Sequence, residues 1–338
     1  MPTLAITSRR PRTDLVHYAS PELLVTSRHR RFSAEAADGA VVWEGRFPRM
    51  HVDAAGASRI LRRFGRLDQC ALSPVGEQWV AIRGGIIYLY APGGALTKVG
   101  ALRQCRIPLQ MLSTGNAAIF GEYGSNPERK PLPVWRVDAN GAECVLELPA
   151  GRARHVHGVF EDPFTGRYWI ATGDFEHESW LISVDRDFRN PEYLGDGSQR
   201  FRAVALFFFE DAIVWLTDSQ FVQNRVMRLD RATGRVDEGM PIPSPAWFGK
   251  VLTDGWLLAG CAWEHGEGCM RDGATLLASR NGLDWTEVAF WKKDRWPAPW
   301  FRDGVIRFAP GAQHSGDFTL CGEGLRGLDG TMLRCALQ

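Results

Sequence analysis

Short apolar runs rich in Val, Ile, Trp, Phe and Tyr alternate along the whole chain with clusters of Gly, Pro, Asp and Asn. This alternation is typical of β-strands joined by turns, and no long stretch carries the period of a helix. One brief helix is predicted, over 54–64. A recurring phrase combines an apolar strand that closes on a small pair, a polar stretch, a second apolar strand and an Asp/Gly turn. Its clearest copies lie at 168–185 and 213–230.

The phrase recurs with a period of about 45 residues, which is the sequence signature of a β-propeller. The segments that carry it cover 20–62, 66–105, 106–150, 152–196, 199–243, 245–291 and 298–338. We therefore predict an all-β fold, a seven-bladed β-propeller with four-stranded antiparallel blades. A count of six blades and a large β-sandwich are the alternatives. The prediction treats 1–338 as a single domain, with 1–18 as an extended or ring-closing N-terminal segment.

Two groups of residues resemble known propellers. The segment 279–285, Ser-Arg-Asn-Gly-Leu-Asp-Trp, resembles the Asp-box turn of sialidase-like propellers, and 183–187 with Tyr193 resembles a worn copy. In those families the Asp-box is a folding turn remote from the active site. The stretch 155–234 is similar to uncharacterised propeller-type proteins encoded among bacterial polysaccharide genes. The residues that carry this second resemblance lie at 155–158, 162–163, 169–174, 199–204, 217–219 and 229–234. It implies a glycan context.

Charge and composition exclude several other classes of function. The formal net charge is +1 and the isoelectric point is near 7.7, so nucleic acid and anionic membranes are not expected partners. The basic clusters at 28–31 and 59–66 are accordingly predicted to be solvated faces. No apolar run reaches the roughly 20 residues that span a bilayer, and the N-terminus lacks an export signal. Seven scattered cysteines without a C-x-x-C pair predict free thiols and a cytoplasmic protein.

The candidate site follows from the propeller geometry. The innermost strand of each blade lines the central channel, and the loops after the second strands reach over one mouth of it. The predicted inner strands are 155–160, 200–204, 246–250 and 299–302. The loops over the mouth are predicted at 121–124, 173–178, 217–224 and 261–267. Together these segments bring imidazoles, guanidiniums, indoles and carboxylates toward one axis.

Such a mixture suits a carbohydrate, because aromatic rings stack on sugar faces, arginine forks bind carboxylates, and titratable groups transfer protons. The predicted catalytic residues are Asp174, Asp218, Glu122, His157 and His155. The predicted substrate-binding residues are Arg202, Arg302, Trp247, Trp300, Tyr123, Glu176, Asn224 and His265. We therefore predict an enzyme that acts on a bacterial polysaccharide or oligosaccharide.

Two reactions fit these residues. A glycoside hydrolase would use two carboxylates from Glu122, Asp174, Glu176 and Asp218. A uronate lyase would neutralise the sugar carboxylate with Arg202 or Arg302 and use His155 or His157 as the base. The alternative to an enzyme is a non-catalytic glycan-binding or scaffold propeller in polysaccharide biosynthesis, because the same fold can carry many unrelated functions.

Each candidate residue also has a structural interpretation. The two histidines of His155-Val-His157 lie on one face of a strand and could bind a metal with a nearby acid, but structural or substrate hydrogen bonding is preferred. No metal and no cofactor are therefore predicted. Asp174 and Asp218 could cap turns, and Arg202 could pair with an acid of the next blade.

Overall fold

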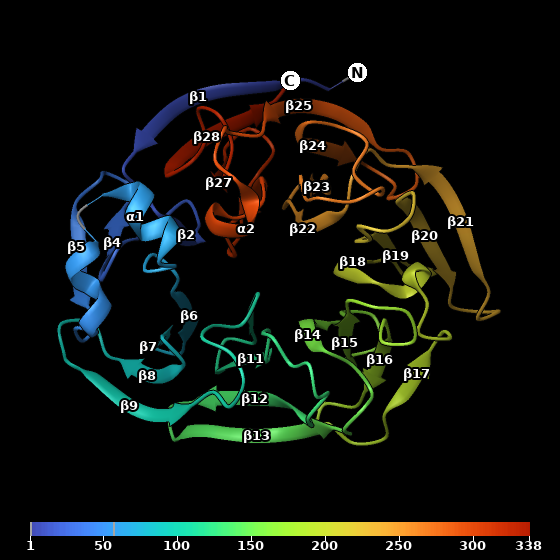
Figure 1. Ribbon diagram of the computed structural model, residues 1–338, viewed down its shortest axis with the longest axis horizontal. Coiled ribbons are helices and arrows are strands. Elements are labelled where there is room, and N and C mark those ends of the chain that lie inside the picture. The colour runs from blue at the N-terminus through green and yellow to red at the C-terminus, as the bar shows by residue number, and fades with distance from the viewer. Residues whose placement is uncertain (1, 57) are drawn as a thin grey trace. The chain divides into compact units, whose positions relative to one another are not determined.

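The computed structural model describes residues 2–56 and 58–338. Its strands form seven four-stranded antiparallel sheets, and within a sheet each strand pairs with the next strand of the chain, except where the N-terminal strand joins the last sheet. The fold is thus a seven-bladed β-propeller, as the repeat predicts, and Figure 1 traces the strand order. The blades coincide closely with the predicted segments because each period supplies four apolar runs separated by turn residues.

The first three sheets in the chain are β2–β5, β6–β9 and β10–β13. Their strands are β2 (Leu15–Ala19), β3 (Leu23–Arg28), β4 (Arg31–Ala36), β5 (Val41–Arg46), β6 (Ala71–Val75), β7 (Gln78–Arg83), β8 (Ile86–Tyr90), β9 (Leu96–Ala101), β10 (Leu112–Ser113), β11 (Ala117–Gly121), β12 (Leu132–Asp138) and β13 (Gly141–Leu148). The first blade begins earlier than predicted, because β2 falls inside the segment that the sequence assigned to the N-terminal extension.

The next three sheets are β14–β17, β18–β21 and β22–β25. Their strands are β14 (His155–Glu161), β15 (Tyr168–Gly173), β16 (Leu181–Val184), β17 (Glu192–Leu194), β18 (Ala203–Phe208), β19 (Ala212–Thr217), β20 (Arg225–Asp230), β21 (Val236–Pro241), β22 (Ala246–Val251), β23 (Leu257–Cys261), β24 (Gly273–Ser279) and β25 (Thr286–Lys292). Between β24 and β25 the turn is closed by Trp285 Nε1, which donates to the carbonyl of Gly282 at 2.7 Å. This turn is the segment that resembles an Asp-box.

The last sheet joins the two ends of the chain. It contains β26 (Val305–Phe308), β27 (Phe318–Glu323), β28 (Thr331–Leu337) and the N-terminal strand β1 (Leu4–Pro11). β1 pairs antiparallel with β28, from Leu4 opposite Leu337 to Pro11 opposite Thr331, and the two run side by side in Figure 1. Residue 1, which belongs to the predicted N-terminal segment, lies outside the described residues.

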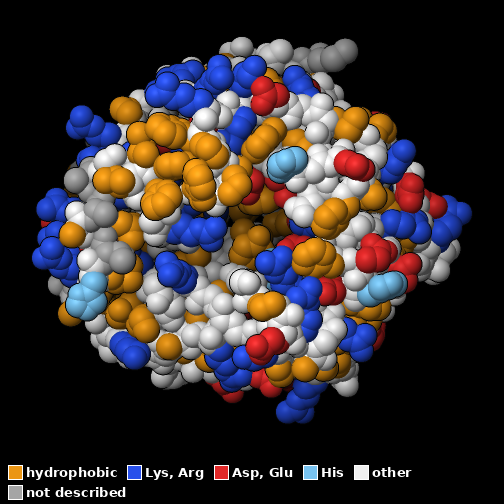
Figure 2. Space-filling model, in the orientation of Figure 1, with side chains coloured by type: hydrophobic (Ala, Val, Ile, Leu, Met, Phe, Trp, Pro, Cys, Tyr) orange, Lys and Arg blue, Asp and Glu red, His pale blue; other side chains and the backbone are white. Residues whose placement is uncertain are grey.

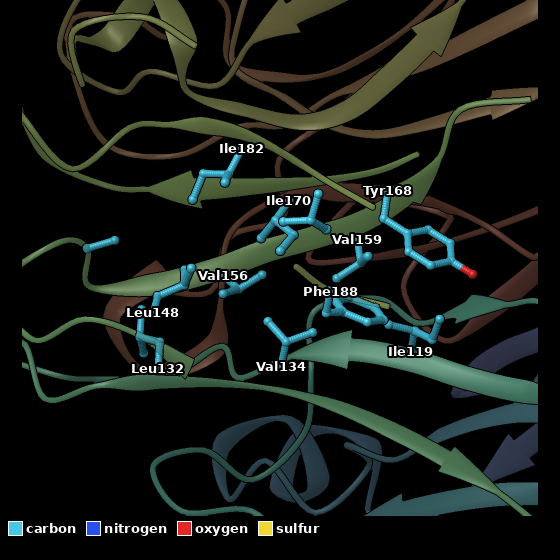
Figure 3. Close-up of a cluster of buried hydrophobic side chains, with 12 residues drawn as sticks. Ile119, Leu132, Val134, Leu148, Val156, Val159, Tyr168, Ile170, Ile182 and Phe188 are labelled. Atoms are coloured by element: carbon cyan, nitrogen blue, oxygen red, sulfur yellow. The ribbon is translucent and has the colours of Figure 1, made fainter. Parts of the chain in front are cut away.

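Two compact units make up the chain, one of Met1–Asp68, Val214–Arg228 and Val236–Gln338, the other of Gln69–Ile213 and Leu229–Arg235. We call them the first unit and the second unit. In the second unit an apolar cluster fills the space between the β10–β13 and β14–β17 sheets, where Val134 faces Val156, Val159 and Ile170 (Figure 3). β-branched side chains suit such a pleated surface, because they pack well against neighbouring strands. This packing fixes the start of β14, which carries the two histidines.

The first unit has a comparable core between its β22–β25 sheet and the sheet closed by β1. Leu258, Leu276, Ile306 and Leu320 are all fully buried in this cluster. The core side chains on each strand are separated by one residue or follow the bulges, which matches the period of two expected for strands. The apolar runs that define the repeat are therefore the faces that blades bury against each other.

The helical segments correct three predictions. The predicted helix over 54–64 is instead a 3-10 turn, η1 (His51–Ala55), and a six-residue helix, α1 (Arg59–Phe64); residue 57 lies outside the described residues. The predicted inner strand at 200–204 is wrong in its first three residues, and the predicted inner strand at 299–302 contains no strand residue. There, η2 (Gln199–Phe201) precedes β18 and α2 (Ala298–Phe301) precedes β26. Pro299 lies in the first turn of α2, where a missing N–H costs nothing.

Candidate functional site

A cluster in the second unit brings together His155, His157 and Asp174. β14 begins at His155, which lies opposite Gly173, the last residue of β15, so Asp174 directly follows the paired end of the hairpin. The register shifts between Val156 and Gly158, which makes His157 a bulged residue. A β-bulge redirects a side chain, and both imidazoles reach the carboxylate of Asp174.

The three side chains meet at nearly equal distances. The Nε2 atoms of His155 and His157 are 3.2 Å apart. Oδ1 of Asp174 lies 2.9 Å from Nε2 of His155 and 3.2 Å from Nε2 of His157. Gly173 makes this approach possible, since a Cβ at that position would lie 2.5 Å from Cε1 of His157. The three polar atoms therefore form a compact triangle.

The opposite ring nitrogens determine the tautomers. Nδ1 of His155 is 3.1 Å from the carbonyl oxygen of Gly124, and Nδ1 of His157 is 2.9 Å from the carbonyl oxygen of Ala203. A carbonyl oxygen only accepts hydrogen bonds, so each Nδ1 carries the proton. A neutral imidazole with its proton on Nδ1 has a lone pair on Nε2. In their neutral forms both rings therefore direct an acceptor atom toward the carboxylate.

Asp174 is also held by groups outside the two imidazoles. Nη2 of Arg202 is 3.2 Å from Oδ1, and Nη1 of Arg202 donates to the Asp174 carbonyl at 3.0 Å. Nε2 of Gln199 donates to the same carbonyl at 3.0 Å. On the other side, Nη1 of Arg154 lies 3.4 Å from Oδ2. Two guanidinium groups thus surround a single carboxylate.

These surroundings fix the charges of the cluster. Burial opposes ionisation of the Asp174 carboxyl, but imidazoles that are protonated and donate from Nε2, together with the charge of Arg202, outweigh burial and hold its pKa well below the usual range. Burial lowers the pKa of His155, and Asp174 only partly offsets that effect. At neutral pH Asp174 is therefore an anion and the His155 ring is neutral.

Tyr123 and Glu122 come from the loop after β11 and have different environments. The ring of Tyr123 packs on His155 with centroids 4.1 Å apart. Glu122 is buried, and its carboxylate accepts hydrogen bonds from the backbone N–H groups of Arg103 and Gln104 at 2.7 and 2.5 Å. Nε1 of Trp135 donates to the same carboxylate at 3.0 Å. The contacts of Glu122 are thus those of a structural anchor, whereas Tyr123 touches the cluster.

The solvent edge of the cluster carries an exposed aromatic ring. The ring centroid of Phe175 lies 5.4 Å from Cζ of Arg129 and 5.5 Å from Cζ of Arg154. Arg129 is paired with Glu178 at 2.7 Å. The loop that supplies Tyr123 continues along a cleft of about 600 Å³. Charged and polar residues line this cleft: Arg103, Gln104, Ser125, Asn126, Pro127, Glu128, Lys130, Pro131 and Glu147.

Several predicted site residues belong to the first unit. Asp218 is buried there. Asn224 is also buried, and its side chain forms hydrogen bonds with the backbone of Ser219 and Gly268. The guanidinium of Arg302 pairs with Glu323 and Asp68. These contacts make Asn224 and Arg302 structural in this fold. Of the other predicted residues, Trp247 is half-buried, Trp300 and His265 are exposed in the first unit, and Glu176 is exposed in the second.

Arg154, Gln199 and Phe175 contact or border the cluster but are not among the site residues predicted from the sequence. Each is a chain neighbour of a predicted residue or segment, since Arg154 precedes His155 and Phe175 follows Asp174. Gln199 begins the segment 199–204, which carries part of the resemblance to the propeller-type proteins of polysaccharide genes. It was not predicted as a site residue because the predicted inner strand begins at residue 200. The carbonyl oxygens that fix the imidazole tautomers carry no signal in the sequence, because any residue provides one.

The basic cluster at 59–66 is not the solvated face that the sequence predicted. In α1 the guanidinium groups of Arg62 and Arg63 point inward, and these residues are only 4% and 2% exposed. Arg62 pairs with Asp14 at 2.9 Å, and Arg63 pairs with Asp294 at 2.6 Å. The buried Asp14 and the partly buried Asp294 thus hold the two arginines inward.

As a consequence, α1 presents its apolar side chains to solvent. Leu61 and Phe64 are 47% and 57% exposed, and Trp300 of α2 is 65% exposed. Phe64 packs against Phe301 with centroids 5.6 Å apart, which joins the two helices. Apolar side chains gather over α1 and α2 in Figure 2. This arrangement inverts the usual amphipathic helix, in which the apolar face is buried.

Comparison with known proteins supports the fold alone. No family model matches the chain, and no curated protein matches it either. Among solved structures, the chain is similar to one in the mitotic checkpoint complex, with a TM-score of 0.60, 10% identity, and 98% and 91% of the two chains covered. The WD40 domain of Neurospora crassa Pan2 matches with a TM-score of 0.58, 10% identity, and coverage of 98% and 94%. The N-terminal domain of Nup159 matches with a TM-score of 0.55, 8% identity, and coverage of 99% and 95%.

Among the described residues, no helix has the length and apolar character needed to cross a membrane.

Proposed function

We propose that the chain recognises an acidic saccharide at the solvent edge of the His155–His157–Asp174 cluster. The observation that carries this proposal is the exposed ring of Phe175 with the guanidinium of Arg154 beside it. An aromatic ring offers a platform for a sugar face, and a guanidinium fork matches a carboxylate.

The charge of the cluster supports an anionic ligand. The carboxylate of Asp174 faces two guanidinium groups, those of Arg154 and Arg202, while the His155 ring is neutral. This set therefore carries one more positive than negative charge. A uronate carboxylate entering beside Arg154 would balance it, whereas a neutral sugar would not.

The groups of the cluster suit elimination better than hydrolysis. Hydrolysis needs a protonated carboxyl near a second carboxylate. Asp174 is held ionised, and the Glu122 carboxylate is occupied by three N–H donors. Elimination from a uronate needs a cation that neutralises the sugar carboxylate and a base that removes the C5 proton; the C4–O bond then breaks, a C4–C5 double bond forms, and the departing oxygen takes a proton from water. Arg154 or Arg202 supplies the cation, and in the chain without a bound metal Nε2 of His155 supplies the base.

The test uses trigalacturonate as the acidic probe and maltotriose as the neutral control, with binding measured by calorimetry. We expect the chain to bind trigalacturonate only. Arg154→Gln should weaken binding about tenfold or more, because a hydrogen bond to a charged group is lost, whereas Arg334→Gln in the first unit should leave it unchanged. Equal binding of both trisaccharides, or of neither, would overturn the proposal.

Incubation of the chain with trigalacturonate distinguishes elimination from hydrolysis. Absorbance from a C4–C5 double bond in the product supports elimination. New reducing ends without that absorbance would contradict the preference for elimination, and binding without any product would establish a non-catalytic glycan-binding propeller instead.

A scaffold function is the second candidate, favoured by the outward apolar face of α1. Exposed apolar patches of this kind mark interaction sites on soluble proteins. Exposed Arg295 lies 5.3 Å from the Trp296 ring, and Trp296 packs on Phe301. A cation at the edge of an apolar patch fits a partner protein that combines acidic and apolar side chains in one segment.

A photo-crosslinking residue at Leu61 tests this candidate in the cell that makes the protein. We expect a discrete protein adduct from Leu61 that is lost with Trp300→Ala, and no such adduct from a crosslinker at Val42, which is comparably exposed in β5. Equal adducts from both positions, or an adduct that is insensitive to Trp300→Ala, would exclude the α1–α2 face as a docking surface.

A further inference from the structure

We propose that His155, His157 and Asp174 form a binding site for a divalent transition-metal ion. This assignment reverses the sequence prediction that the chain has no metal. The three ligand atoms are Nε2 of each imidazole and Oδ1 of the carboxylate. The carbonyl oxygens of Gly124 and Ala203 occupy the Nδ1 sides of the two rings, so both Nε2 atoms are left to bind an ion together with Oδ1.

The size of the triangle fits metal coordination. For metal–ligand distances of about 2.1 Å, adjacent ligand atoms lie roughly 3.0 Å apart in an octahedron and roughly 3.4 Å apart in a tetrahedron. The three separations in the cluster are 2.9, 3.2 and 3.2 Å. An ion placed above this triangle would contact all three atoms without moving the backbone.

The outer contacts of the histidines are those of metal ligands. Metal-bound histidines usually donate the other ring N–H to a carbonyl or carboxylate, which fixes the tautomer and the ring orientation. Gly124 and Ala203 supply such carbonyl oxygens to the two rings. Both rings are also buried, so their orientations are set by packing.

The donor set selects the class of ion. Two imidazoles and one carboxylate suit Zn²⁺, Fe²⁺, Co²⁺ or Mn²⁺, whereas Ca²⁺ and Mg²⁺ prefer oxygen ligands alone. Three protein ligands leave further coordination positions open. The side chain of Asp174 is 15% exposed, so an open position would face the same edge as Arg154 and Phe175.

The two arginines predict that metal and anion bind cooperatively. Arg154 and Arg202 already give the cluster an excess positive charge, so their repulsion lowers its affinity for a divalent ion when no anion is bound. An anionic ligand relieves that repulsion. This second part of the inference rests on the proposed recognition of an acidic saccharide, and linkage requires that each ligand raise the affinity of the other by the same factor.

The test begins with the full chain freed of metal by a chelator and titrated with Zn²⁺ in the absence of saccharide. We expect one Zn²⁺ per chain by calorimetry, and a visible absorption spectrum of bound Co²⁺ in a parallel titration. His157→Gln and Asp174→Asn should each weaken Zn²⁺ binding at least tenfold. His314→Gln changes an exposed histidine of the first unit and should leave Zn²⁺ binding unchanged.

Two outcomes would overturn the site: no binding of Zn²⁺ or Co²⁺ by the folded chain, or binding that the cluster variants do not weaken. Circular dichroism shows whether each variant is folded. If His157→Gln does not fold, the test relies on the isosteric variant Asp174→Asn. Titration is then repeated with saturating trigalacturonate, where Zn²⁺ affinity should rise about fivefold or more. An unchanged affinity would overturn the coupling, while a failure to bind trigalacturonate leaves the Zn²⁺ result standing.

Discussion

The Nε2 atoms of His155 and His157 lie 3.2 Å apart, and both rings donate their Nδ1 protons to backbone carbonyl groups. Two acceptor atoms therefore face each other beside the ionised carboxylate of Asp174. The two Nε2 atoms and Oδ1 of Asp174 lie within 3.2 Å of one another, and the carboxylate contributes a negative charge. Arg202 compensates part of this charge, and the remaining lone pairs are what give the cluster its chemistry.

The glycine at the end of β15 is predicted to be essential for this arrangement. Gly173→Ala would place a Cβ 2.5 Å from Cε1 of His157, so the ring or the hairpin must shift. We expect a loss of about 1–3 kcal/mol in the free energy of unfolding, the usual cost of overpacking. Gly316→Ala is the matched control, because its Cβ would meet only the flexible side chain of His314. Urea unfolding of both variants provides the measurement, and equal stabilities would contradict the packing described for Gly173.

Glu122 is predicted to act in folding. Glu122→Gln would direct an amide NH₂ group at backbone N–H groups that now donate to the carboxylate, so we expect a loss of about 1–3 kcal/mol in the free energy of unfolding. Glu143→Gln, at an exposed ion pair, should change stability by under about 0.5 kcal/mol. A Glu122→Gln protein of unchanged stability that loses activity on trigalacturonate would instead assign Glu122 to the reaction.

The buried ion pair between Arg62 of α1 and Asp14 predicts that a conservative substitution of Asp14 strongly lowers the free energy of unfolding. Asp14 is buried and accepts hydrogen bonds from Arg62 at 2.9 and 3.0 Å and from the backbone N–H of His29 at 2.7 Å. Asp14→Asn leaves the Arg62 guanidinium buried without its counter-charge, so we expect a loss of about 3–5 kcal/mol in the free energy of unfolding. Asp317→Asn breaks an exposed pair with Arg334 and should cost under about 1 kcal/mol. Thermal unfolding that gives equal losses would contradict the buried network.

Acid stability is predicted to depend on His17. Burial, with a smaller contribution from the charge of Arg307, lowers the pKa of His17 to about 3. Between about pH 6.5 and 3 the unfolded chain therefore binds a proton at this residue that the folded chain does not bind. The free energy of unfolding should fall as the pH is lowered through this range, by up to about 1.4 kcal/mol per pH unit from this group.

Urea unfolding of the original chain and of His17→Gln at a series of pH values measures this dependence. The variant should show a shallower decline below pH 6.5, and above about pH 7 the two curves should run parallel, because His17 is then neutral in both states. Equal slopes below pH 6.5 would contradict the assignment.

The architecture was predictable because it depends on periodicity, and the site was only partly predictable because it depends on contacts. The strand that begins at His155 and the acid after Gly173 follow from the repeat, so the meeting of these groups could be expected. The anchoring of Glu122 could not, since its donors are backbone groups of Arg103 and Gln104, far earlier in the chain.

The errors at α1 and α2 have different physical causes. Arginine-rich segments are usually solvated, but the buried Asp14 and the partly buried Asp294 reverse this for Arg62 and Arg63. The apolar residues around Trp300 predicted a strand, although Pro299 suits the first turn of a helix. Tertiary partners outside the local window thus determine which side of α1 is buried, whereas the signal for α2 was the local proline.

The most direct test of the central claim is anomalous diffraction from crystals grown with Zn²⁺, with data collected on both sides of the zinc absorption edge. We expect an anomalous peak about 2.1 Å from Nε2 of His155, Nε2 of His157 and Oδ1 of Asp174. Crystals of Asp174→Asn should show a weaker peak or none. A map without a peak at the cluster, in crystals where the three side chains keep the positions described for them, would contradict the claim.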